Sequence, residues 1–463
     1  MEKISSDIFR MYDIRGIYGQ DLTDNTALLI GKALGTFFQE KGQKRIIVGR
    51  DNRISGKALL ENLTNGLLAT GCEVVDLGVV IAPIVYFSWF KIDAQATAFV
   101  TASHNPAQYN GFKCSLNKKP LVGEDYQKIK RICLEEKFKS GSGLRTKIDL
   151  WPAYKEKIIS SVKLTKKLKI ALDCGNGTAS LFAPELLREM GVEIIPLYCD
   201  SDGSFPNHQP YPQKTEFYTE LINTIKEKKC DLGLSFDGDG DRLGIYDETG
   251  NFVENDRLAM IFGQDICEKT KNPKIVMNVS TSLSVIDFIH KAGGEVILWK
   301  TGYPYISEKM KQTGALFGAE ISGHFFFADR FFGFDDALYA AVRALEIFDK
   351  RKESVSQIIN ALPKYFETRE FRVEIPKNVN KQILVEKIKK DLVQRYPDLK
   401  IIDLDGVRFS FPTGWGLIRS SNTEPLLTGR AEAKDEETLS KIKEIIKKEL
   451  LENKISLNWE EAA

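Results

Sequence analysis

Lys44-Arg-Ile-Ile-Val-Gly49, followed by Gly71-Cys-Glu-Val-Val-Asp-Leu-Gly78, has a pattern that returns twice, and this repeat predicts the fold. The later copies are Lys169-Ile-Ala-Leu-Asp173 with Gly191-Val-Glu-Ile-Ile-Pro-Leu197, and Lys274-Ile-Val-Met-Asn278 with Gly293-Gly-Glu-Val-Ile-Leu298. Each copy is a basic residue, an apolar strand, a polar turn, an amphipathic helical stretch, a glycine that ends the helix and a second strand. A strand-helix-strand unit of about 30 residues builds a parallel sheet, so we expect three α/β domains.

The repeat does not return after about Thr368, where the pattern changes. Shorter strands and helical stretches over Lys381–Arg395 and Glu436–Leu451 indicate a C-terminal α+β domain. The expected fold class is therefore α/β, with three similar α/β domains of mostly parallel sheets and a fourth, α+β domain. The expected bounds of the four domains are 1–148, 149–252, 253–366 and 367–463.

The composition describes a multidomain globular chain: 463 residues, of which 43% are hydrophobic and 28% charged. The 65 Lys and Arg residues are balanced by 64 Asp and Glu residues, so the chain has no excess of positive charge to neutralise a nucleic-acid backbone. Seven scattered cysteines without a Cys-x-x-Cys pair indicate free thiols in a reducing compartment and argue against zinc. The longest apolar stretch, Leu77–Phe90, is too short to cross a membrane and contains Pro83, so we expect a cytoplasmic protein.

Thr101-Ala-Ser-His-Asn-Pro106 follows a buried strand and carries a candidate nucleophile. Pro106 ends the strand in a turn, so Ser103 is presented on a loop. His104 and Lys113 place two proton-handling groups near this hydroxyl, which is what activating a weak nucleophile requires. The competing interpretation is a serine-rich turn with a capping role.

Asp237-Gly-Asp-Gly-Asp241-Arg242 also follows a strand and indicates a metal site. The intervening glycines allow three carboxylates to turn toward one hard cation. A calcium EF-hand is a competing pattern, since Glu248 has the right spacing, but Arg242 stands where that loop needs glycine and the flanks read as strands. An acidic surface turn without a metal is a third interpretation. Three carboxylates leave positions open for a phosphate oxygen, which suits Mg²⁺ in phosphoryl transfer.

Gly414-Trp-Gly-Leu-Ile-Arg419-Ser-Ser-Asn-Thr-Glu-Pro425 reads as a strand that ends in arginine and a turn rich in hydroxyls. Such a turn is a plausible cradle for a phosphate dianion. A second turn, Asp173-Cys-Gly-Asn-Gly-Thr178, is a poor dinucleotide fingerprint and is interpreted as structural, and no Walker-type phosphate loop occurs.

Five motifs in this sequence resemble those of the phosphomannomutase/phosphoglucomutase family, the α-D-phosphohexomutases, and they occur in the same order along the chain. Thr101–Pro106 with Tyr109-Asn-Gly-Phe-Lys113 is similar to the family's phosphoserine loop. The further resemblances are Tyr12-Asp-Ile-Arg15-Gly16 to a signature that reaches into the catalytic cleft, Asp237–Arg242 to the metal loop, Gly318-Ala-Glu-Ile-Ser-Gly-His324 to the sugar-recognition loop and Arg419–Thr423 to the phosphate-binding loop. The resemblance implies four domains around a central cleft.

The resemblance also implies a role for each matching residue. Catalytic roles fall on Ser103, His104, Lys113, Arg15 and Arg242, metal ligation on Ser103, Asp237, Asp239 and Asp241, and substrate contacts on Tyr12, Lys300, Tyr303, Glu320, Ser322, His324, Arg419, Ser421, Asn422 and Thr423. From pattern alone we expect Tyr12 and Ile14 to form a short strand that carries Arg15 at its end. Tyr303 stands where many members of the family have histidine, and a tyrosine cannot carry a positive charge near neutral pH.

The implied activity is the interconversion of the 1- and 6-phosphates of mannose and of glucose. Phosphorylated Ser103 would donate its phosphoryl group, and the intermediate would be a 1,6-bisphosphate, with Mg²⁺ as cofactor and glucose 1,6-bisphosphate or mannose 1,6-bisphosphate as activator. A phosphoglucosamine mutase is the nearest rival, although its usual glutamine is Ile321 here. A sugar-phosphate phosphatase with the same serine and metal, and a non-catalytic sugar-phosphate-binding protein, are the competing functions. The expected partner is a phosphosugar, with no nucleic acid, membrane or obligate protein partner indicated.

Overall fold

The computed structural model describes residues 4–376, 379–421 and 426–459. The chain divides into two compact units, which are described separately: unit 1 is Met1–Asn255 with Ser322–Ile359, and unit 2 is Asp256–Ile321 with Asn360–Ala463. Among the described residues, no helix has the length and apolar character needed to cross a membrane.

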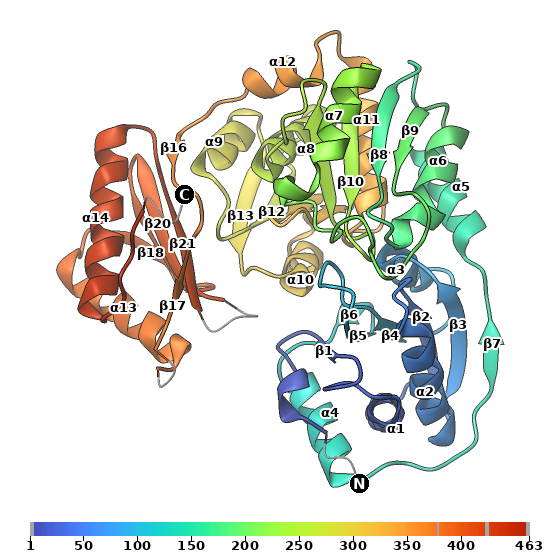
Figure 1. The fold of residues 1–463 in the computed structure, drawn as a ribbon. Helices are drawn as coiled ribbons and strands as arrows, with labels where there is room; N and C mark the ends of the chain where they lie inside the picture. Colours follow the sequence, from blue (N-terminus) through green and yellow to red (C-terminus); the bar gives the residue numbers. More distant parts are fainter. Residues whose placement is uncertain (1–3, 377–378, 422–425, 460–463) are drawn as a thin grey trace. The chain divides into compact units, whose positions relative to one another are not determined.

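The first sheet of unit 1 has the strand order β1-β5-β4-β2-β3-β7, with β6 paired to β5. Strands β2, β3, β4 and β7 run parallel to one another, whereas β5 is antiparallel to β1 and β4. Figure 1 shows α1, α2 and α4 on one face of this sheet. The bounds are η1 Ser6–Ile8, β1 Ile14–Ile17, α1 Asp24–Glu40, β2 Arg45–Arg50, α2 Gly56–Ala69, β3 Glu73–Val79, α3 Ala82–Ser88, β4 Ala96–Val100, β5 Tyr109–Leu116, β6 Lys119–Pro120, α4 Glu124–Glu135 and β7 Arg145–Lys147.

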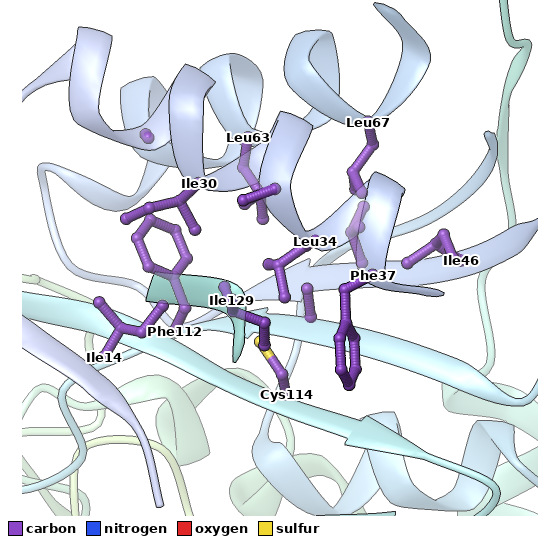
Figure 2. Packing of buried hydrophobic residues seen from close by; sticks show 14 of the residues in the cluster. Ile14, Ile30, Leu34, Phe37, Ile46, Leu63, Leu67, Phe112, Cys114 and Ile129 are labelled. Atoms are coloured by element: carbon purple, nitrogen blue, oxygen red, sulfur yellow. The ribbon is translucent and has the colours of Figure 1, made fainter. Parts of the chain in front are cut away.

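The core of this sheet depends on a close approach of α1 to α2. A Cβ on Gly31 would lie 2.2 Å from the carbonyl oxygen of Leu63, and a Cβ on Gly66 would lie 2.3 Å from that of Leu28, so each helix needs a glycine at the crossing. Figure 2 shows the apolar side chains of both helices directed at the sheet strands, where they are fully buried. Each such side chain stabilises the fold by about 1.5–3 kcal/mol.

The second sheet of unit 1 has the order β11-β10-β8-β9. Strand β8 is parallel to β9 and β10, while β10 and β11 form an antiparallel hairpin whose turn carries the aspartate motif. The bounds are α5 Trp151–Ser161, β8 Lys169–Asp173, η2 Thr178–Leu181, α6 Ala183–Glu189, β9 Glu193–Leu197, η3 Thr215–Phe217, α7 Thr219–Lys228, β10 Leu232–Phe236, β11 Leu243–Asp247, β15 Phe325–Phe327, α11 Ala337–Lys350 and α12 Val355–Asn360.

Unit 2 contains a parallel sheet, in which β12 pairs with β13 and β14, and an antiparallel sheet of order β16-β21-β20-β19-β18 with β17 on β21. Helices α13 and α14 cover one face of the antiparallel sheet (Figure 1). The bounds are α8 Asn255–Lys269, β12 Lys274–Asn278, α9 Leu283–Lys291, β13 Glu295–Trp299, α10 Tyr303–Thr313, β14 Phe317–Ala319, β16 Phe366–Glu367, β17 Phe371–Glu374, α13 Lys381–Arg395, β18 Lys400–Ile402, β19 Val407–Phe411, β20 Gly414–Ser420, β21 Leu426–Ala433 and α14 Glu436–Glu452.

The three sequence repeats fold as predicted, as β2-α2-β3, β8-α6-β9 and β12-α9-β13, each with its two strands parallel. The expected fold class is therefore confirmed, while the expected domain bounds stay predictions. One detail of the sequence interpretation is wrong: strand β1 begins at Ile14, so Tyr12 precedes it and Arg15 is its second residue, not its end. The shorter strands expected after Thr368 are present as β16, β17 and β18, which span two, four and three residues, whereas β20 and β21 span seven and eight.

Candidate active site

Ser103 lies on the loop between β4 and β5, in a backbone conformation that is unusual for a residue with a side chain. Its φ is +49°, in the left-handed region, and it is buried. Its Oγ donates to Asp237 Oδ2 over 2.7 Å and lies 3.2 Å from His104 Nδ1, while its N–H donates to Thr101 Oγ1. The hydroxyl is therefore held against a carboxylate of the aspartate loop, with an imidazole beside it.

Arg53, which lies outside the motifs predicted from the sequence, fixes this loop. The side chain is fully buried, and its guanidinium uses all five of its N–H groups. It donates to the Asp51 carboxylate and to four backbone carbonyls, those of Ser103, Asn105, Pro106 and Tyr109, over 2.6–3.1 Å. Since left-handed conformations cost of order 1–3 kcal/mol outside glycine, a loop such as this one needs surroundings that over-determine it.

The aspartate loop approaches Ser103 closely because glycine separates its carboxylates. A Cβ on Gly238 would lie 2.4 Å from the carbonyl oxygen of Ser103. Asp237 Oδ1 accepts hydrogen bonds from the N–H groups of Gly240, Asp241 and Arg242, which orients its Oδ2 toward the serine hydroxyl. Asp239 and Asp241 are fully buried as well.

The three carboxylates form a donor set that fits a divalent cation. Ligand atoms of Asp237, Asp239 and Asp241 all lie within 4.8 Å of one another. Lys113 Nζ donates to Asp239 over 2.8 Å and to Asp241 over 2.7 Å. One buried oxygen each of Asp239 and Asp241 accepts no hydrogen bond in the part of the chain that the structure describes. A buried set of three carboxylates facing one ammonium retains negative charge, so a metal ion is the natural addition.

Burial and neighbouring charges set the protonation of this site. Burial and the charges of Asp241 and Asp239 raise the pKa of Asp237 well above its ordinary value. Burial also opposes ionisation of Asp241, but the positive charge of Lys113, with that of Arg242, outweighs it and lowers that pKa. Burial, together with the charges of Arg242 and Arg15, holds the pKa of His104 well below its ordinary value, so its imidazole is neutral near pH 7.

His324 joins the site through contacts with Arg242 and Asp335. Arg242 Nε donates to His324 Nε2 over 3.0 Å, so the ring proton is on Nδ1, which lies 3.1 Å from Asp335 Oδ2. Arg242 Nε can only donate, because guanidinium carries no acceptor. Asp335, which the sequence analysis missed, thus fixes the tautomer and orientation of His324. No local motif signals it, since its contact with His324 arises from folding.

Of the remaining predicted residues of unit 1, Arg15 contacts the serine loop. Arg15 Nη1 donates to the carbonyl oxygen of Ala102 over 3.1 Å and to Asn105 Oδ1 over 2.5 Å, and its Nη2 pairs with Asp13. Arg15 therefore supports the loop backbone. Tyr12 and Ser322 are half-buried.

Gln209 and Tyr211 contact His104. The ring of Tyr211 lies 4.4 Å, centroid to centroid, from that of His104, and Gln209 Nε2 donates to the His104 carbonyl oxygen.

Unit 2 contains the rest of the predicted residues. Lys300 is exposed, and Tyr303 is the buried first residue of α10. Glu320 is also buried, and its Oε1 accepts a hydrogen bond from the N–H of Gly302 over 2.6 Å. Asn422 and Thr423 lie outside the described residues.

Arg419 and Ser421 lie at the end of β20, where two further charged residues meet them. Lys381 Nζ donates to the Ser421 carbonyl oxygen, and burial with the charge of Arg419 lowers the pKa of Lys381. Asp405 accepts a hydrogen bond from Arg419 Nε and forms an ion pair with its Nη2. Sequence reasoning missed both Lys381 and Asp405, which are distant from the Arg419 motif along the chain.

Comparisons with known proteins cover almost the whole chain. Family models described as phosphoglucomutase/phosphomannomutase match in four parts: alpha/beta/alpha domain I at residues 6–140, domain II at 152–250, domain III at 254–366 and the C-terminal domain at 372–449. A phosphomannomutase/phosphoglucomutase of Pseudomonas aeruginosa is 39% identical over 447 residues, which cover 96% of each chain. A phosphoglucomutase of Neisseria meningitidis is 39% identical over 99% of this chain and 100% of its own.

The fold agrees with the same family. The crystal structure of a phosphoglucomutase/phosphomannomutase family protein from Burkholderia thailandensis superposes with a TM-score of 0.92. It is 35% identical and covers 98% of this chain and 99% of its own. With four consecutive family models, relatives at 39% identity along nearly the full length and one shared fold, this chain belongs to the phosphoglucomutase/phosphomannomutase family, the α-D-phosphohexomutases.

Proposed function

We propose that this protein is a phosphohexomutase that interconverts the 1- and 6-phosphates of mannose and of glucose. The observation that carries the proposal is the 2.7 Å contact of Ser103 Oγ with Asp237 inside a buried cluster of three aspartates. A serine in a metal-binding cluster is the arrangement that a phosphoserine enzyme requires, and curated relatives are named phosphomannomutase/phosphoglucomutase and phosphoglucomutase.

Ser103 would carry the phosphoryl group between turnovers. In the first half-reaction the bond between phosphorus and Ser103 Oγ breaks, a bond to the free hydroxyl of the bound hexose phosphate forms, and that hydroxyl loses its proton to a base. The product is a 1,6-bisphosphate. After the sugar turns over in the site, its other phosphate returns to Ser103 Oγ and the second isomer leaves. Glucose 1,6-bisphosphate or mannose 1,6-bisphosphate would prime unphosphorylated enzyme as an activator.

Mg²⁺ held by Asp237, Asp239, Asp241 and Ser103 would neutralise charge on the transferring phosphoryl group. The chain's own groups handle the protons. Neutral His104, next to Ser103 Oγ, can accept a proton, whereas Lys113, held as an ammonium between two carboxylates, is suited to donate one. Proton transfer of this kind contributes about 10²–10⁴ in rate. Arg15 and Arg242 add positive charge, and His324 presents a fixed tautomer.

In unit 2, Arg419 and Ser421, with Asn422 and Thr423, would bind the phosphate that does not react, and Glu320 would contact sugar hydroxyls. In unit 1, Tyr12 and Ser322 are the candidates for substrate contacts. Lys300 and Tyr303 would complete this set. Tyr303 supplies a hydroxyl but no positive charge, so it would recognise the sugar by hydrogen bonding.

We also propose a cytoplasmic location and no nucleic-acid partner. The seven cysteines, all within the described residues, are free thiols, which suits a reducing compartment. The formal net charge of +1 offers no excess of positive charge for a nucleic acid.

A coupled assay tests the activity. Purified protein with Mg²⁺ and a trace of 1,6-bisphosphate is offered mannose 1-phosphate, glucose 1-phosphate and glucosamine 1-phosphate in parallel. We expect turnover of the first two, loss of that turnover in Ser103→Ala and wild-type turnover in Ser160→Ala, an exposed serine of α5. Free sugar as the main product would instead indicate a phosphatase, and preferred turnover of glucosamine 1-phosphate would indicate the aminosugar mutase.

A further inference from the structure

Asp405 contacts two segments that we propose to bind the substrate: the end of β20, which carries Arg419, and the segment Lys300–Tyr303. It lies after β18, and its Oδ2 accepts a hydrogen bond from Arg419 Nε over 3.1 Å and forms an ion pair with Arg419 Nη2 at 3.0 Å. The same oxygen accepts a bond from the N–H of Thr301, at 3.3 Å. One carboxylate oxygen therefore connects the strand that carries Arg419 with the Lys300–Tyr303 segment, more than a hundred residues away in sequence.

The backbone beside Asp405 is built for this approach. Gly406 has a φ of +92°, and a Cβ there would lie 2.5 Å from Arg419 Cβ and 2.5 Å from the carbonyl oxygen of Ile418. Only glycine tolerates both that conformation and that proximity. The turn is therefore pressed against β20 at the residue before Arg419 and at Arg419 itself.

The geometry selects one edge of the Arg419 guanidinium. Asp405 occupies the edge formed by Nε and one N–H of Nη2, and because the group is planar, its Nη1–Nη2 edge is turned away from Asp405. A phosphate binds arginine best through two parallel N–H groups of one edge, so fixing the plane decides which edge a phosphate meets.

The Lys300–Tyr303 segment is held at two successive N–H groups. Asp405 accepts from Thr301, and Glu320 accepts from Gly302, whose φ of +127° is one that residues with side chains rarely adopt. The position of the segment and the plane of Arg419 thus depend on a common side chain.

We propose that Asp405 is a positioning residue of the site for the unreacting phosphate, acting through Arg419 and through the backbone of Thr301. The inference rests on the proposed function, because it takes the ligand of Arg419 to be the phosphate of a hexose phosphate. Asp405 itself, being a carboxylate, would repel that phosphate and would not touch it.

The test is a double-mutant cycle. Asp405→Asn keeps a side-chain oxygen that can accept the hydrogen bond from the N–H of Thr301, but it removes the negative charge that holds Arg419. Arg419→Ala removes the guanidinium on which Asp405 acts. Asp403→Asn is the matched control, since Asp403 lies two residues earlier, is exposed and pairs with Lys389. KM and kcat are measured for glucose 1-phosphate. The Kd of glucose 1-phosphate is measured by calorimetry in a Ser103→Ala background, where no turnover occurs.

We expect Asp405→Asn to raise KM and Kd about tenfold, which corresponds to about 1.4 kcal/mol of lost binding free energy. The value of kcat should change less than threefold. Asp403→Asn should leave all three constants within twofold. In the Arg419→Ala background Asp405→Asn should add nothing further, and Asp405→Glu, which restores the charge, should recover part of the affinity even if the asparagine variant folds poorly.

Unchanged KM and Kd in Asp405→Asn, or effects of Asp405→Asn and Arg419→Ala that multiply, would overturn the inference. Absence of mutase turnover in the wild type would instead reject the proposed function. The calorimetric Kd, which needs no turnover, separates these two failures.

Discussion

Replacing Arg53 with lysine would remove the support of the serine loop while keeping its positive charge. Arg53 satisfies five acceptors with five N–H groups, and a lysine ammonium has three, so at least two buried acceptors lose their partner. An unpaired buried acceptor costs about 1–3 kcal/mol, which gives a destabilisation of at least about 2–6 kcal/mol. Release of the loop would also move the Ser103 hydroxyl from Asp237, and a displacement of about 1 Å can lower a rate about a hundredfold.

Urea unfolding and mutase kinetics of Arg53→Lys measure the two effects. Arg50→Lys is the matched control, because Arg50 stands three residues earlier, is half-buried and makes one side-chain hydrogen bond within the described residues, to the Asp51 carbonyl oxygen. We expect Arg53→Lys to lower both the urea midpoint and kcat/KM, and Arg50→Lys to leave both near wild type. Wild-type stability and activity in Arg53→Lys would refute the assignment of loop support to Arg53.

Three further predictions follow from separate contacts. Mg²⁺ should raise the Tm of the wild type by neutralising the aspartate cluster that Lys113 faces, and Asp239→Asn should abolish that rise in a thermal-shift assay, whereas an equal rise in the variant would count against the site. Gly238→Ala should lower kcat/KM by at least about tenfold, since its Cβ would lie 2.4 Å from the Ser103 carbonyl oxygen and displace the loop. A wild-type rate in that variant would show that the loop can move aside. Glu346 is buried, which opposes ionisation, but hydrogen bonds from Arg330 and Lys350 outweigh this and lower its pKa to about 2. The ionised Glu346 therefore contributes to protein stability at pH values above its ordinary pKa of about 4.3, and this contribution is lost as the pH falls toward 2. Glu346→Gln should reduce the fall of Tm across that pH range. A Tm that falls with the same slope as in the wild type would contradict this prediction.

The sequence was sufficient for the fold because its repeats are local. A basic residue, an apolar strand, a helix and its terminal glycine are all contained within about 30 residues, so the pattern specifies β2-α2-β3 and its two counterparts directly. The aspartate loop was predictable for the same reason, since its three carboxylates and two glycines are adjacent in the chain.

Residues that act across the fold could not be predicted in this way. Arg53 meets the serine loop 50 residues later, and Asp405 meets Thr301 and Arg419 from a turn with no motif. Asp335 reaches His324 only because the β15 segment folds back. For Arg53 a signal did exist, because it follows the first repeat strand at the edge where parallel sheets bind ligands.

The alternation of apolar and charged residues around Tyr12 and Ile14 also predicted the wrong limits for β1. Tyr12 and Ile14 suggested a strand that ends at Arg15, but pairing with β5 decides its limits, and that partner lies nearly a hundred residues away. The individual site residues remain predictions until variants are measured.

The phosphorylation state of Ser103 during turnover shows whether this serine carries the phosphoryl group. The protein is incubated with Mg²⁺ and glucose 1,6-bisphosphate, part of it is then chased with glucose 1-phosphate, and the peptide containing Ser103 is analysed by mass spectrometry in both samples. We predict a phosphate on Ser103 that the chase removes as sugar bisphosphate appears. Turnover with Ser103 unmodified throughout would contradict it.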